Sequence, residues 1–296
     1  MMTSAGRQLP QLERMEMFVA LPGGFAVRDL QDLMAYPWFS LAKSKRVAPI
    51  QYRSAQFSLQ VEGTHEHGIA TIWDADVLIW AASQIVEARD AGLPTSRLLA
   101  ATPYEILRFI RRGTSVRDYV RLKAAFDRLQ ATTVATSIRQ AAARRLHRFS
   151  WINEWKERST PEGKPIGLEL ILPDWFYSGV LDASLVLTID SAYFSLTGGI
   201  ERWLYRLVRK HAGRQHGGWR FQMRHLYVKS GSLARFSDFA FDIRRIVARQ
   251  SIPGYELRII QHLRNGEVLA FRPRVTRSFG KSITDLVQSI RAVKKL

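Results

Sequence analysis

The stretch from Gln222 to Pro273 reads QMRHLYVKSGSLARFSDFAFDIRRIVARQSIPGYELRIIQHLRNGEVLAFRP, and it decides the fold of this chain. A short helix is predicted over 223–229, and the segment 230–234, which contains serine and glycine, supplies a turn. A longer helix is predicted over 235–250, because apolar residues recur in it at helical spacing. Two helices separated by such a turn are typical of a helix-turn-helix motif.

A β-hairpin is predicted directly after these helices. Two β-rich runs, 255–263 and 268–272, lie on either side of Asn265-Gly266. This dipeptide suits a tight turn, because both central residues of the turn need positive φ and these residue types adopt it at low cost. The hairpin completes a winged helix-turn-helix, whose second helix usually lies in the major groove of DNA. The stretch therefore predicts a DNA-reading element.

The whole chain is strongly basic. Its 296 residues carry a formal net charge of +18, and the sequence pI is near 10.7. Nearly half of the residues are apolar, which is typical of a globular protein of one large or two ordinary domains. A globular protein this basic usually faces a polyanion, either nucleic acid or an anionic membrane surface. The alternative is a charge that only keeps the protein in solution.

Several classes of site and location are excluded or disfavoured. The chain has no cysteine, so disulfides, thiolate chemistry and cysteine-based zinc sites are excluded. The first seven residues lack the apolar core of a signal peptide. The most apolar helix candidate, 77–86, is too short to span a bilayer. We expect a soluble cytoplasmic protein with no membrane partner.

The same order of elements is predicted twice along the chain. A helix, a short strand, a short helix, a turn with glycine, a long helix and a hairpin run from Asp74 to Leu172, and again from Gly199 to Pro273. Residue identities do not match closely, so only the pattern is repeated. The predicted fold class is α+β, with two tandem winged helix-turn-helix domains.

These predictions divide the chain into five segments. They are an N-terminal arm (1–27), a first winged-helix domain (28–172), a linker helix and strand (173–198), a second winged-helix DNA-binding domain (199–275) and a basic C-terminal tail (276–296). Elements expected in the first domain include a helix over 28–34, a basic loop over 39–46, a long helix over 116–130 and hairpin strands over 146–157 and 165–172. Residues 69–73 are compatible with a further strand.

The helix over 235–250 is expected to present a base-reading face. The side opposite its apolar residues carries Ser237, Asp238, Phe241, Arg245 and Arg249, flanked by Arg244. Arginine suits guanine O6 and N7, aspartate can accept from cytosine N4, and phenylalanine can touch a thymine methyl. The alternative is a solvated face on which Asp238 and Asp242 pair with Arg235 and Arg245.

The first long helix carries a basic stripe of its own. Arg117, Arg121 and Arg128 recur at helical spacing around Ala124, and Arg111-Arg112 precede the helix. The stripe suggests that both domains touch DNA, although a protein-binding role for the first domain remains open. Many of the basic residues from Arg202 to Arg249 are expected to contact phosphates. The remaining candidate DNA-binding residues are Lys43, Lys45, Arg46, Lys229, Arg235, Arg264 and Asn265.

No catalytic, metal or cofactor site is predicted. His65-Glu-His67 superficially resembles the His-hydrophobic-His pair of rolling-circle nucleases, but its middle residue is a glutamate in a glycine-flanked loop. A phosphate-binding Gly-x-x-x-x-Gly-Lys-Ser/Thr loop, a cluster of carboxylates for two metals and a Gly-x-Ser-x-Gly motif are all absent from the sequence. We therefore expect a protein that is not an enzyme.

One long run and several short ones resemble a known family. The run RDLQDLMAYPWFSLAKSKR over 28–46, followed by IQYR over 50–53, resembles the N-terminal signature of the plasmid replication initiator protein A family. Further similar segments are WDAD (73–76), PYEIL (103–107), PDWFY (173–177) and LTGGIERWLYR (196–206). The resemblance covers roughly residues 10 to 273.

The resemblance implies an initiator with two winged-helix domains. Such a protein binds repeated sequences (iterons) in the double-stranded DNA of a plasmid origin, helps to open the duplex and brings host replication proteins to it. In related initiators a monomer uses both domains on the repeats, whereas a homodimer can repress the initiator's own gene. The rival interpretations are a winged-helix transcriptional repressor and, in another class, a nicking replicase.

Overall fold

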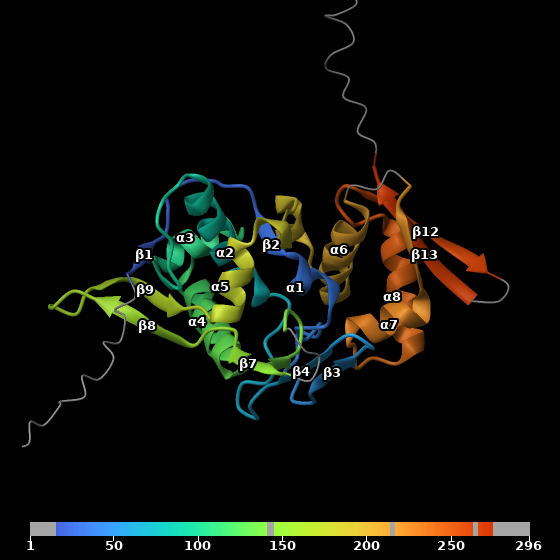
Figure 1. Ribbon diagram of the computed structural model, residues 1–296, viewed down its shortest axis with the longest axis horizontal. Coiled ribbons are helices and arrows are strands. Elements are labelled where there is room, and N and C mark those ends of the chain that lie inside the picture. Colours follow the sequence, from blue (N-terminus) through green and yellow to red (C-terminus); the bar gives the residue numbers. More distant parts are fainter. Residues whose placement is uncertain (1–15, 141–144, 214–216, 263–265, 275–296) are drawn as a thin grey trace, which may run out of the picture.

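The computed structural model describes residues 16–140, 145–213, 217–262 and 266–274. In this part of the chain, eight α-helices and four β-sheets form a mixed α+β fold. The molecule is elongated, and its elements fall into a first half (16–198) and a second half (199–274), on the left and right of Figure 1. The α+β prediction is confirmed.

The second half contains the stretch 222–273, which predicts a helix-turn-helix followed by a hairpin. Its elements are α6 (Gly199–Ala212), β11 (Trp219–Gln222), α7 (Met223–Ser230), α8 (Phe236–Arg249), β12 (Tyr255–His262) and β13 (Gly266–Pro273). β13 lies between β11 and β12 in a three-stranded antiparallel sheet. Trp203, Leu207, Phe239, Ile243 and Leu269 are buried between the helices and this sheet. These helices and strands lie where the sequence predicts them.

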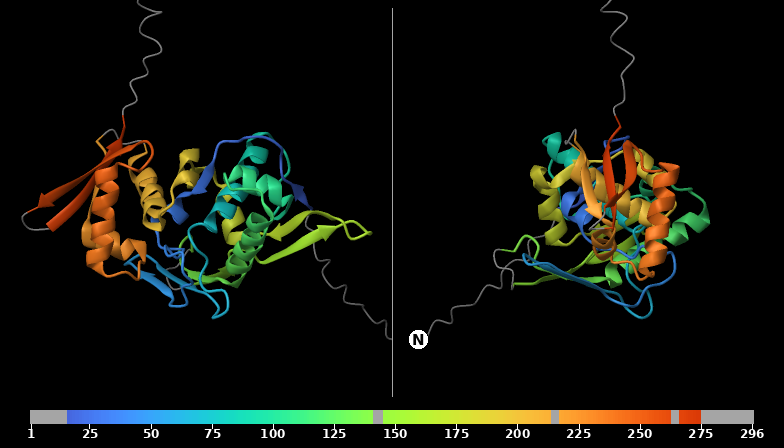
Figure 2. Two further views of the ribbon diagram at one scale, coloured as in Figure 1. Left: turned by 180° about the vertical axis from the view of Figure 1, so that it is seen from behind. Right: turned by 90° about the vertical axis from the view of Figure 1, so that its right-hand side faces the viewer.

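The first half repeats this order of elements. Its corresponding members are α2 (Ala75–Asp90), β5 (Leu98–Ala101), α3 (Pro103–Phe109), α4 (Val116–Ala131), β8 (Glu154–Ser159) and β9 (Pro165–Ile171). Here too the last strand lies between the other two, in the order β5-β9-β8. The β8–β9 and β12–β13 hairpins project from opposite ends of the molecule (Figures 1 and 2). The pattern repeated in the sequence is thus repeated in the order of elements and strands.

Side-chain caps set the starts of the two helices that follow β5. Thr102 accepts a hydrogen bond from the backbone N–H of Glu105, whose carboxylate accepts from Thr102 in return, and Pro103 occupies the first helical position of α3. Ser115 and Asp118 form the same kind of capping box at the start of α4. Each box satisfies backbone donors that the helix itself leaves unpaired.

The first half also contains a separate four-stranded sheet. It contains β3 (Ile50–Arg53), β4 (Ser58–Glu62), β6 (Thr133–Thr136) and β7 (His147–Ser150) in that order, and it lies along the lower edge of Figure 1. The prediction of one strand over 146–157 is wrong, because β7 and β8 belong to different sheets. Trp151 and Ile152 are both fully buried, which breaks the in–out alternation of a single strand. Residues 69–73 form no strand.

The expected N-terminal arm and first helix also need correction. Within residues 1–27, β1 (Phe18–Val19) pairs in parallel with β5, so its described end is part of the fold. The helix expected over 28–34 is instead β2 (Arg28–Leu30) followed by α1 (Gln31–Ala35). β2 forms because it pairs with β10 (Val186–Thr188), a strand far away in the sequence.

The segment expected as a linker, 173–198, packs on the first half. It contains α5 (Asp174–Leu181), the 3-10 turns η1 (Ala183–Leu185) and η2 (Ser191–Ser195), and β10 between them. α5 packs against α2, and its Trp175 and Phe176 are buried. The predicted helix and strand are present, but they belong to the core of the first half.

Buried ion pairs join the two halves. Arg206 of α6 makes two hydrogen bonds of 2.7 and 2.9 Å to the carboxylate of Asp29 on β2. Arg202, one turn earlier, donates to Asp76 of α2 at 2.7 Å. Burial raises the pKa of both carboxyl groups, and the guanidinium groups oppose that shift. Arginine keeps its proton in such a site, so each contact is a charged pair that orients the second half on the first.

Candidate nucleic-acid interface

α8 presents the polar face that the sequence predicts. Phe239, Ala240, Ile243 and Ile246 are buried, and the opposite side of the helix is exposed. The exposed residues on and beside it are Arg235, Ser237, Asp238, Phe241, Arg244, Arg245 and Arg249. The helix therefore brings this group of candidate DNA-binding residues together on one surface.

Ion pairs occupy part of this face. Arg245 donates to Asp242 at 2.8 Å, as the solvated-face alternative expects, and its guanidinium lies 6.0 Å from the ring centroid of Phe241. Arg244 makes two hydrogen bonds, of 2.8 and 2.7 Å, to Glu267 on β13. Such pairs at an exposed surface are worth about 0–1 kcal/mol, so a DNA phosphate or base can replace them. Arg249 has no carboxylate partner among the described residues.

The basic stripe of α4 divides into two parts. Arg117 and Arg121, near the start of the helix, are exposed. Arg128, near its end, makes two hydrogen bonds of 2.8 and 2.7 Å to Asp74, which also accepts from the backbone of Thr71 at 2.7 Å. Arg121 lies 3.8 Å from Asp118 in an exposed ion pair, which a ligand can replace. The first two arginines are therefore available to a ligand, whereas Arg128 supports the packing of α4.

The two arginines in the turn before α4 also have hydrogen-bond partners within the protein. Arg112 donates to Asp76 at 2.9 Å, so Asp76 holds Arg112 and Arg202 together. Arg111 adopts a left-handed backbone conformation (φ +55°) and donates to Ser191 at 2.7 Å. Both arginines remain at the surface, but their guanidinium groups already have partners.

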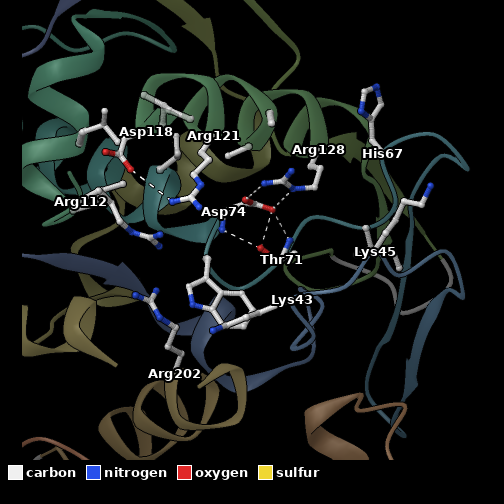
Figure 3. Close-up of a pocket in the computed structure, with 18 of the residues that line it drawn as sticks. Lys43, Lys45, His67, Thr71, Asp74, Arg112, Asp118, Arg121, Arg128 and Arg202 are labelled. Carbon is white, nitrogen blue, oxygen red and sulfur yellow. Dashed lines mark hydrogen bonds and ion pairs between the residues drawn. The ribbon is translucent and has the colours of Figure 1, made fainter. Parts of the chain in front are cut away.

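A cavity of about 880 Å³ lies between α4, the loop 43–45 and the start of α6 (Figure 3). Arg121 and Arg128 line it from α4, and Arg202 lines it from the opposite side. Lys43 and Lys45 lie at its loop side, with the Lys43 ammonium 5.7 Å from the ring centroid of Trp73. Cations outnumber carboxylates in this lining. The basic loop predicted over 39–46 thus lies beside the first basic helix.

Two of the candidate DNA-binding residues are not exposed to a ligand, because their side chains are buried. Arg46 donates to the carbonyl oxygens of Ala48, Pro49 and Gly231 at 2.8, 3.1 and 2.6 Å. Lys229 donates to the carbonyl oxygen of Ala35 at 3.2 Å. Burial, assisted by the nearby Lys210 charge, lowers the pKa of Lys229 to about 8. Both residues join the halves of the molecule and are not at its surface.

Arg202 and Arg206, expected among the phosphate contacts, are also buried and bound to aspartates. Their carboxylate partners are distant in sequence, so the local sequence of α6 does not indicate that these two arginines are buried. Arg264 and Asn265 lie outside the described residues. Sequence reasoning missed the exposed Val116 and Val120 of α4, although both fall outside the apolar stripe of that helix.

Two further properties of the described residues bear on function. Within them, no three His, Asp or Glu side chains gather as a metal site would require. None of the helices in the described ranges combines the length and apolarity needed to cross a membrane.

Comparisons with known proteins show the family to which this chain belongs. The sequence pattern described as "Replication initiator protein A" matches residues 28–257. The chain belongs to the replication initiator protein A family. A relative in Wigglesworthia glossinidia brevipalpis, described as "Putative replication protein", is 31% identical over 229 residues, which are 76% of this chain and 82% of the relative.

Solved structures support the fold of this family member. A crystal structure of domains 2 and 3 of RctB, determined with selenomethionine, is similar with a TM-score of 0.60 and 13% identity, covering 83% of this chain and 98% of that one. A second crystal structure of RctB domains 2–3 gives a TM-score of 0.51 and 15% identity, covering 79% and 92%. At such low identity the likeness concerns the arrangement of elements alone.

Proposed function

We propose that this replication initiator binds repeated sequences in a plasmid origin through two tandem winged-helix domains. It then promotes local opening of the duplex and brings host replication proteins to it, in the cytoplasm and without covalent catalysis of its own. One observation carries the proposal. In each half the helix before the hairpin, α4 or α8, exposes unburied arginines on the side opposite its core residues.

The order of elements supports the winged-helix interpretation. In that motif the second helix of the helix-turn-helix enters the major groove and the hairpin lies beside it. α3–α4 with β8–β9, and α7–α8 with β12–β13, have this order. The exposed arginines of α4 and α8 then face base edges, while Lys43, Lys45 and Arg235 are placed to contact phosphates.

Footprinting of the purified protein on the DNA of its own plasmid origin tests the proposal. We expect protection of a repeated sequence, with each site spanning more than one helical turn because two helices read it. Affinity should fall with salt, by a log–log slope of about −0.9 for every phosphate neutralised. Uniform protection, without preference for any sequence, would contradict origin recognition.

A transcriptional repressor could use the same surfaces on an operator. Deletion of the gene from its plasmid separates the two functions. Maintenance of the deleted plasmid is compared in cells that do and do not express the protein from a second replicon. We expect the plasmid to be lost without the protein and maintained with it. Unchanged maintenance in its absence would favour the repressor. A homodimer that represses its own gene is compatible with both functions, and the oligomeric state on operator DNA would identify it.

A nicking replicase is the rival from another class. Incubation of supercoiled origin DNA with the protein and Mg²⁺ should yield no relaxed circles if initiation is non-covalent. Relaxed circles bound to protein would establish an enzyme and overturn this part of the proposal.

A further inference from the structure

The exposed face of α4 carries two unburied valines. Val116 is 78% exposed and Val120 is 62% exposed. Single exposed apolar residues are common, but these two lie one helical turn apart on the same side. The buried side of the helix is formed instead by Leu122, Phe126 and Leu129. The valines therefore contribute nothing to the core of the protein.

The neighbours of these valines complete a mixed surface. Arg117 and Arg121 follow them directly in sequence and are exposed beside them. On the other side, Lys123 forms an ion pair with Glu157 of β8, so the valines lie between the two arginines and the β8–β9 hairpin. This is the place where a winged helix receives DNA.

Both carboxylates of α4 have partners within the protein, and that of Asp118 also lies 3.8 Å from Arg121 in an exposed ion pair that a ligand can replace. Asp118 accepts hydrogen bonds from the hydroxyl and backbone N–H of Ser115. Asp127 accepts from the indole N–H of Trp155 at 3.2 Å. The start of α4 thus offers two guanidinium groups and two branched apolar side chains to a ligand.

We propose that Val116 and Val120 read thymine methyl groups in the major groove. The C5-methyl of thymine is the apolar group that distinguishes this base at the major-groove edge, and apolar side chains recognise it by contact. Residues near the N-terminus of a reading helix lie closest to base edges, which is where both valines are. The inference rests on the proposed function and specifies what α4 recognises.

The test compares thymine with deoxyuridine, which lacks only the methyl group. A duplex is first selected from a random-sequence pool by the wild-type protein, and each thymine is then replaced singly. Burial of one methyl group corresponds to roughly a fourfold change in affinity. We expect a loss of about that size at one or two positions, measured by fluorescence anisotropy.

The valine variants show whether that loss arises at α4. V116A or V120A should bind the thymine duplex more weakly and should show no further loss when the critical thymine becomes deoxyuridine. Alanine favours the helix more than valine does, so these exposed substitutions keep the fold. The matched control is V228A, which removes a valine that is 61% exposed on α7 and should behave as wild type.

The possible results distinguish this inference from the function on which it rests. If selection yields no preferred sequence, the proposed origin recognition itself fails. If a sequence is selected but deoxyuridine costs the wild type and both valine variants equally at every position, methyl recognition by α4 is overturned. If V116A or V120A instead shifts the monomer–dimer balance in sedimentation while DNA affinity is unchanged, the valines form a subunit interface and the proposal is likewise overturned.

Discussion

Arginines have two different roles in this protein, at the surface and in buried ion pairs. Arg117, Arg121 and Arg249 are exposed on helices, whereas Arg202 and Arg206 are buried against aspartates. The sequence does not separate the two groups, because the partner of Arg206 lies 177 residues away. A buried charge requires a partner. The buried arginines can therefore be told from the exposed ones only in the folded structure, where their aspartate partners lie close to them.

The exposed arginines of α8 should govern sequence preference. We expect Arg245→Ala or Arg249→Ala to weaken binding to the origin sequence by about 1–3 kcal/mol, the value of a bidentate contact with guanine. Binding to unrelated DNA should weaken much less, because it depends on total charge. Dissociation constants on both DNAs, at matched salt, measure the difference.

Arg258→Ala is the matched control for the α8 arginines. It removes the same charge from β12, where the guanidinium pairs with Glu256 on the exposed sheet. This variant should lower affinity for both DNAs to a similar small extent. An equal loss on both DNAs for Arg245→Ala or Arg249→Ala would place these residues on phosphates and not on bases.

A histidine in the second half should make stability depend on pH. Burial, with the nearby Lys210, Lys229 and His225, lowers the pKa of His211 to about 4 from its usual 6.5. As the pH falls, this histidine therefore takes up a proton in the unfolded chain at a higher pH than in the folded protein. The free energy of unfolding should be unaffected by this residue above pH 6.5 and should fall as the pH drops from 6.5 toward 4.

His211→Phe tests this prediction, because an aromatic ring retains the contacts with Trp219 and Phe221. The side chain is partly exposed, so solvent screening reduces the effect to about 1 kcal/mol between pH 7 and pH 5. Urea unfolding at both pH values should show the wild type losing that much more stability than the variant. The control His65→Phe makes the same substitution in an exposed loop, away from these contacts.

At the scale of elements, local patterns predict the helices well. α4, α6, α7 and α8 follow from apolar spacing, and α3 follows from the proline at its first position. β2 was missed because its strand conformation depends on β10, which lies in a distant segment. The sheet of β3, β4, β6 and β7 was missed for the same reason, since β4 and β6, which join its two antiparallel strand pairs, are far apart in sequence.

The turn between α7 and α8 depends on one glycine. Gly231 has φ +60°, and a Cβ atom there would come within 2.7 Å of Pro37 in the first half. We expect Gly231→Ala to lower the free energy of unfolding by about 2–4 kcal/mol, the sum of left-handed strain and overpacking. Urea unfolding measures this loss.

Gly254→Ala distinguishes the backbone strain from the overpacking against Pro37. Gly254 has φ +75° but nothing within 4 Å of an added Cβ, so only the backbone strain of about 1 kcal/mol applies there. If both variants lose the same stability, then the contact of the α7–α8 turn with Pro37 contributes nothing to the attachment of the two halves.

At the scale of the whole molecule, polar contacts determine how the halves meet. Arg206–Asp29 and Arg202–Asp76 lie in the interior, and Arg46 and Lys229 donate across the same junction to backbone carbonyls. A purely apolar junction would tolerate sliding, whereas paired charges require one alignment. A fixed alignment would hold α4 and α8 at one spacing, which two reading helices on one DNA site require.

The Arg206–Asp29 pair provides the test of this alignment. Arg206→Met leaves the Asp29 carboxylate buried without a counter-charge, so we expect a loss of about 3–5 kcal/mol in the free energy of unfolding. Replacing both residues, as Asp29→Leu with Arg206→Met, removes the uncompensated charge and should restore most of that stability. Breaking the exposed Arg258–Glu256 pair should cost less than about 1 kcal/mol.

The double variant also separates stability from alignment. If the ion pair orients the halves, the double variant should unfold at nearly wild-type denaturant concentration and yet bind the origin sequence more weakly than the wild type. Its affinity for unrelated DNA should change little, because its net charge is unchanged. Full origin affinity in the stable double variant would mean that the surrounding apolar packing alone fixes the spacing of α4 and α8.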